Sequence, residues 1–193
     1  MPHTFDEAYY HRFYGDPRTR AASPAEQQRQ ARFIATYLRY LQVPVERILD
    51  VGCGLGRLLR QLEKAFPRAE CMGVEVSSYL CDTYGWQCGD AQTYSDERPF
   101  DLVICSDVLG YLNKSDCARA VRNLSRLSRA ALYLNVLTTE DLDICDPQHT
   151  DMNQKLRPVA WYRNHIDRHF VSVGGGLFMK KPLEYPVWHI ERG

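Results

Sequence analysis

Short apolar segments alternate with helical patterns through the middle of this chain, and no other feature limits its possible folds as much. The segments predicted to be buried strands are residues 47–51, 70–74, 86–88, 100–105 and 131–136. Leucines at helical spacing follow the first of them, and a helix is predicted around 116–127 before the last. This alternation predicts right-handed βαβ units, and hence an α/β fold with a parallel sheet and helices on both faces. Ligands of such sheets bind beyond the carboxyl ends of the strands, so the site is expected after residues 51, 74, 88 and 105.

A helical segment precedes this core. Ser23 is a good N-cap, Pro24 suits the first helical position and Glu26 completes a capping box, so a helix is predicted from there to Pro44. Residues 1–22 are rich in aromatic side chains at helical spacing. They are predicted either to form a lid over a site or to pack on the core by ordinary burial.

The chain ends in a predicted hairpin. After a long connection and a helix near residues 159–169, two short strands are expected at 170–173 and 177–181. The run Gly174-Gly175-Gly176 joins them and suits a tight turn between antiparallel strands.

Composition narrows the function classes. The 193 residues include 24 basic and 24 acidic side chains, so the formal net charge is zero and nucleic-acid binding is disfavoured. No apolar run approaches the roughly 18 residues of a membrane-spanning helix, and the chain starts with acids and aromatics rather than a signal peptide. We therefore expect no membrane partner and a cytoplasmic location.

The cysteines fit that location. There are seven of them, an odd number, and none forms a C-x-x-C pair. Reduced, mostly buried thiols are therefore predicted rather than disulfides or a zinc site, and no metal is expected.

A glycine-rich loop follows the first predicted strand. It reads Asp50-Val51-Gly52-Cys53-Gly54-Leu55-Gly56, and its glycines allow a tight turn and the close approach of a ligand. A dinucleotide fingerprint, G-x-G-x-x-G, would need a glycine where Arg57 stands. The alternative is a tight turn with only a structural role.

Carboxylates follow the next two strands. Glu75 can accept both hydroxyls of a ribose, and Asp90, followed by Ala91, can accept a hydrogen bond from an adenine amino group. The alternatives are a solvated surface glutamate and an ordinary turn aspartate.

The four motifs together resemble a known family. The segments DVGCGLG, GVEVS, GDA and FDLVICSDVLGYL, in this order and spacing, are similar to the class I S-adenosylmethionine-dependent methyltransferases of the small bacterial, Rossmann-like type. The similarity covers roughly residues 45–136. It implies a doubly wound, seven-stranded, mostly parallel sheet of order 3-2-1-4-5-7-6 with an N-terminal helical cap. Residues 1–43 would form the cap or lid, and residues 44–193 the cofactor-binding domain.

The resemblance also implies roles for residues. Asp50, Gly52, Cys53, Gly54 and Gly56 would line the methionine and sulfonium part of S-adenosylmethionine. Glu75 and Val76 would hold the ribose, and Asp90 and Ala91 the adenine. The cofactor's substrate side would be lined from Ser106 to Tyr111, including Asp107 and Leu109. The fourth strand lacks the Asn/Asp-Pro-Pro-Tyr/Phe motif of enzymes that methylate amino groups of nucleic acids and glutamine, which disfavours DNA adenine methylation.

Methyl transfer from a sulfonium needs alignment more than acid–base chemistry, so a catalytic residue is not required. If a base exists, the candidates are Tyr14, Asp107, Tyr111 and His149. Tyr10, Tyr14, Tyr111 and Trp161 are the candidates for a lid or substrate contact, because aromatic faces attract the sulfonium cation.

Three charged features of the sequence each allow a structural and a functional interpretation. His165 and His169 are a helix-surface pair or part of a metal site, and the arginine stripe at 119, 122, 126 and 129 is a solvated face or a phosphate contact. Residues 138–154 carry five acids and no Lys or Arg. They form a solvated loop or a substrate loop that favours a cationic or amine substrate.

The predicted function is S-adenosylmethionine-dependent methyl transfer to a small molecule, with S-adenosylhomocysteine as the product. The alternatives are an NAD(P)-dependent oxidoreductase on a Rossmann-like fold and a non-catalytic S-adenosylmethionine-binding protein. RNA or protein methylation is a weaker variant. The acceptor atom and the oligomeric state are left open.

Overall fold

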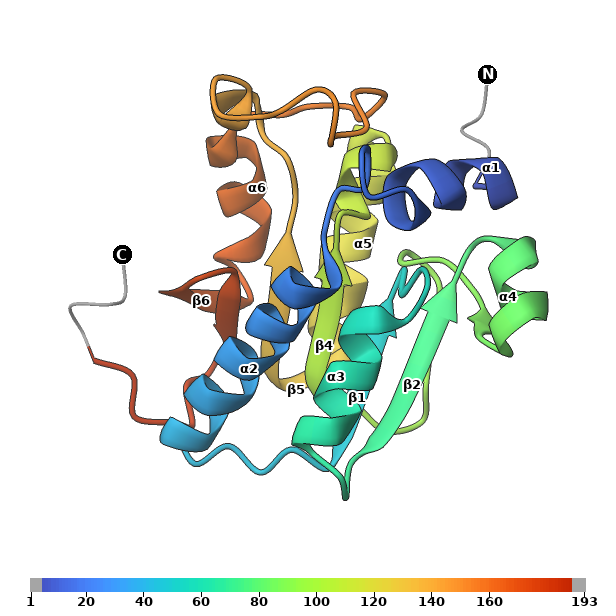
Figure 1. Cartoon of the computed structure of the whole chain (residues 1–193). Coiled ribbons are helices and arrows are strands. Elements are labelled where there is room, and N and C mark those ends of the chain that lie inside the picture. Colours follow the sequence, from blue (N-terminus) through green and yellow to red (C-terminus); the bar gives the residue numbers. More distant parts are fainter. Residues whose placement is uncertain (1–4, 189–193) are drawn as a thin grey trace.

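The computed structural model describes residues 5–188, and a seven-stranded sheet forms its centre (Figure 1). The strands are β1 (Arg47–Val51), β2 (Glu70–Glu75), β3 (Gln87–Cys88), β4 (Phe100–Ser106), β5 (Ser128–Asn135), β6 (Phe170–Gly174) and β7 (Leu177–Lys180). Their order is β3-β2-β1-β4-β5-β7-β6, and β7 runs antiparallel to both of its neighbours while the other pairs are parallel. The predicted order and the predicted terminal hairpin are confirmed.

Helices cover both faces of the sheet. The main ones are α2 (Pro24–Tyr40), α3 (Arg57–Ala65), α4 (Ser78–Tyr84), α5 (Lys114–Leu127) and α6 (Val159–Ile166). Two core clusters lie on opposite faces, one against α2 and α3 and the other against α5 and α6. Successive side chains of a strand point to opposite faces, so Leu102 and Ile104 enter the first cluster while Val103 and Cys105 enter the second. This double burial explains the continuous apolar run of β4.

The predicted capping box at the start of α2 is present. The Glu26 backbone N–H donates to the Ser23 hydroxyl (3.2 Å), and the Ser23 N–H donates to the Glu26 carboxylate (2.6 Å). On the face of α2 that meets the sheet, Ile34 and Leu38 are fully buried. Helix α2 is thus part of the core, whereas the aromatic segment before it lies apart from it.

That aromatic segment forms two short helices, α1 (Glu7–Tyr10) and η1 (His11–Gly15), which we call the cap. The rings of Phe5 and Tyr9 lie 5.1 Å apart and those of Tyr9 and Phe13 5.0 Å, so the three share one face as their spacing predicts. The cap lies above the carboxyl ends of the central strands (Figure 1).

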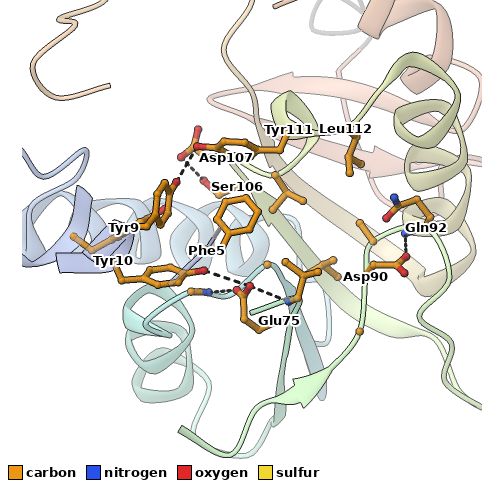
Figure 2. Close-up of a pocket in the computed structure, with 18 of the residues that line it drawn as sticks. Phe5, Tyr9, Tyr10, Glu75, Asp90, Gln92, Ser106, Asp107, Tyr111 and Leu112 are labelled. Carbon is orange, nitrogen blue, oxygen red and sulfur yellow. Dashed lines mark hydrogen bonds between the residues drawn. The ribbon is translucent and has the colours of Figure 1, made fainter. Parts of the chain in front are cut away.

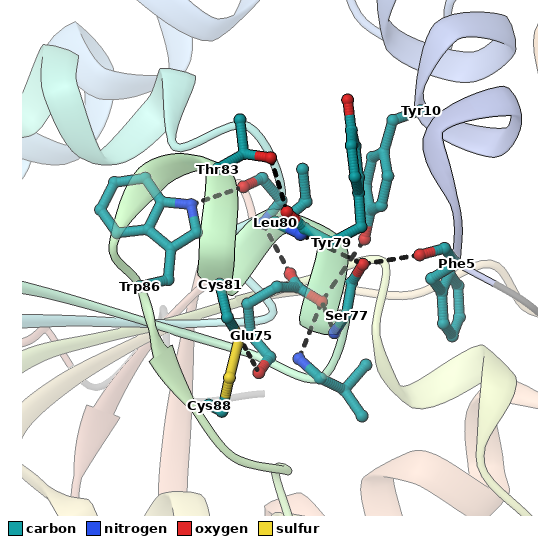
Figure 3. The surroundings of a disulfide bond; sticks show 12 residues. Phe5, Tyr10, Glu75, Ser77, Tyr79, Leu80, Cys81, Thr83, Trp86 and Cys88 are labelled. Atoms are coloured by element: carbon teal, nitrogen blue, oxygen red, sulfur yellow. Dashed lines mark hydrogen bonds between the residues drawn. A yellow bond between two sulfur atoms is a disulfide. The ribbon is translucent and has the colours of Figure 1, made fainter.

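The cysteine prediction is wrong in one place, because Cys81 and Cys88 form a disulfide (Figure 3). The sequence spacing gave no hint, since the contact depends on the turn after α4. Gly85 ends that helix with a φ of +70°, and β3 then returns beside β2, which brings the two Cα atoms to 5.8 Å. The other five cysteines are free.

The connection between β3 and β4 is a turn rather than a third helix, closed by a hydrogen bond from the Tyr94 N–H to the Asp90 carbonyl (3.0 Å). Within residues 5–188, no helix is long and apolar enough to cross a membrane. The same residues contain no group of three or more His, Cys, Asp or Glu that could hold a metal ion.

Candidate functional site

The glycine loop after β1 is held against the end of β2. The N–H groups of Gly52 and Cys53 donate to the Val74 carbonyl (2.7 and 3.2 Å). Gly52 has a φ of +74°, and a Cβ there would lie 2.3 Å from a methyl group of Val108. Gly56 has a φ of +65°, and its Cβ would lie 2.3 Å from the Trp86 ring. Both positions therefore require glycine, for the conformation and for the space.

A cavity of about 340 Å³ opens in front of this loop, below the cap (Figure 2). Residues that follow β1, β2, β3 and β4 line it together with aromatic residues of the cap. Of the predicted cofactor and lid residues, the structure brings together Gly52, Gly54, Glu75, Val76, Asp90, Ala91, Ser106, Asp107, Tyr10, Tyr14 and Tyr111. Phe5 and Tyr9, which were not among the predicted site residues, also line it. The cavity lies at the position predicted by the strand-end rule.

Other predicted cofactor residues lie behind this surface. Cys53, Gly56 and the fully buried Leu109 are not among the lining residues. Asp50 is 3% exposed at the end of β1, where burial and then the nearby Glu75 carboxylate raise its pKa to about 7. Trp161 is on α6, packed against His165 at a ring distance of 4.2 Å and away from the cavity.

Glu75 is the buried acceptor at the centre of the loop region. Its carboxylate accepts hydrogen bonds from the N–H groups of Gly54 (2.8 Å), Val76 (2.8 Å) and Ser77 (3.0 Å). The Tyr10 hydroxyl donates a longer bond of 3.4 Å from the cap. Burial and the Glu75 charge hold the pKa of Tyr10 above its usual range. Glu75 is thus built into the fold rather than a solvated surface residue.

Asp90 organises the loop after β3. Its carboxylate accepts from the N–H groups of Gln92 and Thr93 (both 2.8 Å) and from the Thr93 hydroxyl (2.9 Å). These bonds form an Asx-type turn, and Ala91 and Gln92 of that turn line the cavity. The structure therefore shows the turn role that the sequence kept as an alternative.

The cap is bound to the body by side-chain contacts. The Tyr9 and Tyr111 hydroxyls lie 2.8 Å apart, and the Tyr111 hydroxyl donates to Asp151 (2.9 Å). The Arg57 guanidinium donates to the Tyr14 carbonyl (2.8 Å). Burial raises the pKa of Tyr9 and of Tyr111 above the usual range. The cap thereby closes one side of the cavity.

A second cavity, of about 310 Å³, adjoins the first. Four residues line both cavities, and they are Tyr9, Tyr14, Asp107 and Tyr111. Asp107 has a φ of +59°, a conformation that few non-glycine residues adopt, and its N–H donates to the Asn135 carbonyl (3.0 Å). Desolvation raises the pKa of its carboxyl group. We call these four residues the dividing wall.

The second cavity also contains residues of the acidic segment. Asp141, His149, Asp151 and Gln154 line it. His149, a predicted catalytic candidate, therefore lies in this cavity and not in the first. Its Nδ1 is 3.0 Å from the Arg20 carbonyl, so in the neutral ring Nδ1 carries the proton and Nε2 the lone pair.

Arg157 is a structural residue of the site that sequence reasoning missed. It is 3% exposed and donates to the carbonyls of Leu109 (3.3 Å) and Leu112 and to the Tyr162 hydroxyl (3.0 Å). It thereby fixes the segment that carries Tyr111. A single arginine in a long connection gives no motif from which this role could have been predicted.

Comparisons with known proteins agree with this geometry. A family model described as a methyltransferase domain matches residues 10–173. The chain is 31% identical over 144 residues to a trans-aconitate 2-methyltransferase from Pseudomonas paraeruginosa, a match that covers 71% of this chain and 46% of that protein. It is 35% identical over 75 residues to a malonyl-[acyl-carrier protein] O-methyltransferase from Priestia megaterium, covering 34% of this chain and 27% of that one. The chain thus spans less than half the length of these two relatives.

The fold comparison extends over nearly the whole chain. A magnesium protoporphyrin IX methyltransferase from Synechocystis, solved with bound SAH (S-adenosylhomocysteine), superposes with a TM-score of 0.66 at 18% identity. The match covers 94% of this chain and 92% of that one. From its fold, its glycine loop and the extent of the family match, this chain belongs to the S-adenosylmethionine-dependent methyltransferases of class I.

Proposed function

We propose that this protein transfers a methyl group from S-adenosylmethionine to a small-molecule acceptor, with the cofactor in the first cavity and the acceptor in the second. The observation that carries the proposal is the dividing wall, because two cavities of similar size meet at only four shared side chains. An in-line transfer needs donor and acceptor on opposite sides of one short gap. Because the same four residues line both cavities, the cavities adjoin, and this supports placing the donor in one and the acceptor in the other.

The first cavity fits the cofactor. The loop brings the backbone at Gly52 and Gly54 to the cavity surface, and Glu75 offers a carboxylate for hydroxyl groups. The longest of its four bonds goes to the Tyr10 hydroxyl, so Tyr10 occupies the place that a ribose hydroxyl would take. Asp90 and its turn would contact the adenine, and the aromatic rings of Tyr9 and Tyr14 would face the sulfonium.

When bound, S-adenosylmethionine supplies a methyl group already activated on a sulfonium sulfur. The chain's own tasks are to align the acceptor with that methyl group and to exclude water. The cap performs the second task, because Phe5, Tyr9, Tyr10 and Tyr14 cover the cavity. Asp107 stands where both cavities meet and is our candidate for removing a proton from the acceptor.

We infer a cytoplasmic location for this activity. Five of the seven cysteines are unpaired in the structure, which suits a reducing compartment, where Cys81 and Cys88 would be held as two thiols. Alkylation of the protein in intact cells, followed by mass spectrometry, would show mainly free thiols at these five positions.

Calorimetric titration tests the proposal. We expect S-adenosylhomocysteine to bind with one site and NAD(P)H to show no heat of binding. Tight NAD(P)H binding without S-adenosylhomocysteine binding would overturn it. Cofactor binding without methyl transfer to any member of a broad panel of amines, alcohols and acids would instead support a non-catalytic binding protein.

A further inference from the structure

The second cavity is rich in negative charge and in hydrogen-bond acceptors. Asp107, Asp141 and Asp151 line it, and none of the described residues that line it is Lys or Arg. The Asp141 carboxylate accepts from the N–H (2.9 Å) and the hydroxyl (2.6 Å) of Thr138. Both donors are neutral, so these bonds fix the position of the carboxylate without cancelling its charge.

Two further side chains of this cavity, Gln154 and His149, carry acceptor atoms. Gln154 lines this cavity, and its Oε1 is buried with no hydrogen-bond partner in the described part of the chain. In the neutral ring of His149, Nδ1 donates to the Arg20 carbonyl, which leaves Nε2 as a further acceptor. The cavity therefore fits a molecule that is cationic and rich in N–H donors.

We propose that the methyl acceptor is the nitrogen of a small primary or secondary amine, held in the second cavity by Asp107 and Asp141. The inference rests on the proposed function, because it assigns the substrate class of that same site. The aromatic rings of Tyr9, Phe13 and Tyr14 add a surface that attracts cations. A carboxylate acceptor would instead bring a negative charge beside three carboxylates, and an alcohol would bring no positive charge to balance theirs.

The transfer balances with groups that the site holds. An ammonium substrate first loses one proton to the Asp107 carboxylate, which leaves a lone pair on nitrogen. That lone pair forms the new N–C bond while the C–S bond breaks and its electron pair goes to sulfur. Asp107 then releases its proton to solvent. The raised pKa of Asp107 makes it a stronger base than an ordinary carboxylate.

Three probes of similar shape separate the substrate classes. The protein is saturated with S-adenosylhomocysteine and titrated with 2-phenylethylamine, 2-phenylethanol or 3-phenylpropionate in a calorimeter. We expect the amine to bind at least about tenfold more tightly than the other two. If the amine has no such advantage, including the case in which none of the three binds, the amine class is rejected.

Substitutions test whether the preference for the amine comes from the second cavity. Asp141→Asn should weaken binding of 2-phenylethylamine about tenfold and leave that of 2-phenylethanol within about twofold, because only the amine carries a charge. Asp143→Asn is the matched control, since Asp143 belongs to the same acidic segment but is exposed and does not line the cavity. Equal effects of the two substitutions would reject the role of Asp141.

The cofactor titration keeps the two proposals apart. If S-adenosylhomocysteine itself fails to bind, the proposed function is wrong and the amine assignment falls with it. If S-adenosylhomocysteine binds and the amine does not, only the amine assignment is wrong. Asp107→Asn should bind S-adenosylhomocysteine and lose methyl transfer to the amine, and retention of full transfer would reject its role as the base.

Discussion

At the scale of single residues, two buried carboxylates matter most near the cofactor cavity, with Glu75 lining it and Asp50 lying behind its surface. The two lie at the ends of neighbouring strands, are each 3% exposed and differ in their partners. Glu75 accepts three backbone hydrogen bonds, whereas the main effect on Asp50 is that burial raises its pKa. Substitution should therefore affect binding at Glu75 and the pH dependence of stability at Asp50.

Glu75→Gln is expected to weaken S-adenosylhomocysteine binding by at least about tenfold. An amide has one acceptor oxygen where the carboxylate has two, so part of the network to Gly54, Val76 and Ser77 is lost. Stability should fall by about 1–3 kcal/mol, since charge-assisted bonds to buried N–H groups are replaced. Calorimetry and urea unfolding measure the two effects. Asp82→Asn, at an exposed position of α4, serves as the control and should change neither.

Tyr10→Phe removes only the hydroxyl that contacts Glu75. Because we place a ribose hydroxyl in that position, the loss should leave S-adenosylhomocysteine affinity unchanged or raise it up to about threefold. A tenfold weaker affinity would show that the Tyr10 hydroxyl binds the cofactor directly.

Asp50→Asn should flatten the dependence of stability on pH. The folded-state pKa of Asp50 is raised from 3.8 to about 7, so the folded protein holds a proton there that the unfolded chain has lost. Stability from this group is present at acid pH and is lost as pH rises from about 4 to about 7, by up to about 4 kcal/mol. Urea unfolding of both proteins at a series of pH values tests this. Parallel curves would contradict it.

At the scale of elements, α2 shows how local signals set a boundary. Ser23→Ala removes the side-chain half of the capping box, so the orphan N–H of Glu26 loses its acceptor. We expect a loss of about 1 kcal/mol in the free energy of unfolding. The control is Ser95→Ala, in an exposed loop, which should stay within about 0.5 kcal/mol of the parent. An equal loss in both variants would count against the cap.

The elements were predictable because each has a local cause. The apolar run of β4, the capping box of α2 and the glycines after β1 are properties of adjacent residues. The contacts that complete the site are not local. Tyr9 meets Tyr111 across 102 residues, and Tyr111 meets Asp151 across 40. Such pairings depend on how the cap and the acidic segment pack, so sequence patterns placed these residues near the site without pairing them.

At the scale of the whole molecule, the site depends on the cap, whereas the core does not depend on it. Its aromatic residues cover the first cavity, while the two core clusters are formed by the sheet, α2, α3, α5 and α6. Removing the cap should therefore affect the site without unfolding the core.

Deletion of residues 1–22 should abolish methyl transfer while the core stays folded. The dissociation rate of S-adenosylhomocysteine should rise at least about tenfold, because the cap no longer retains it. Circular dichroism with thermal melting reports the core, and stopped-flow measurements report dissociation. Unchanged turnover, or loss of the cooperative melt, would contradict the assignment.

The hydrogen-bonded line from Tyr9 through Tyr111 to Asp151 joins the cap, the segment after β4 and the acidic loop. Opening the cap breaks a contact that also shapes the second cavity, so the two cavities cannot change shape independently. With the cofactor in one cavity and the acceptor in the other, as we propose, two ligands that both favour the closed line would each raise the affinity for the other, and by the same factor. Binding of either would then be heterotropically coupled to binding of the other through the tyrosines.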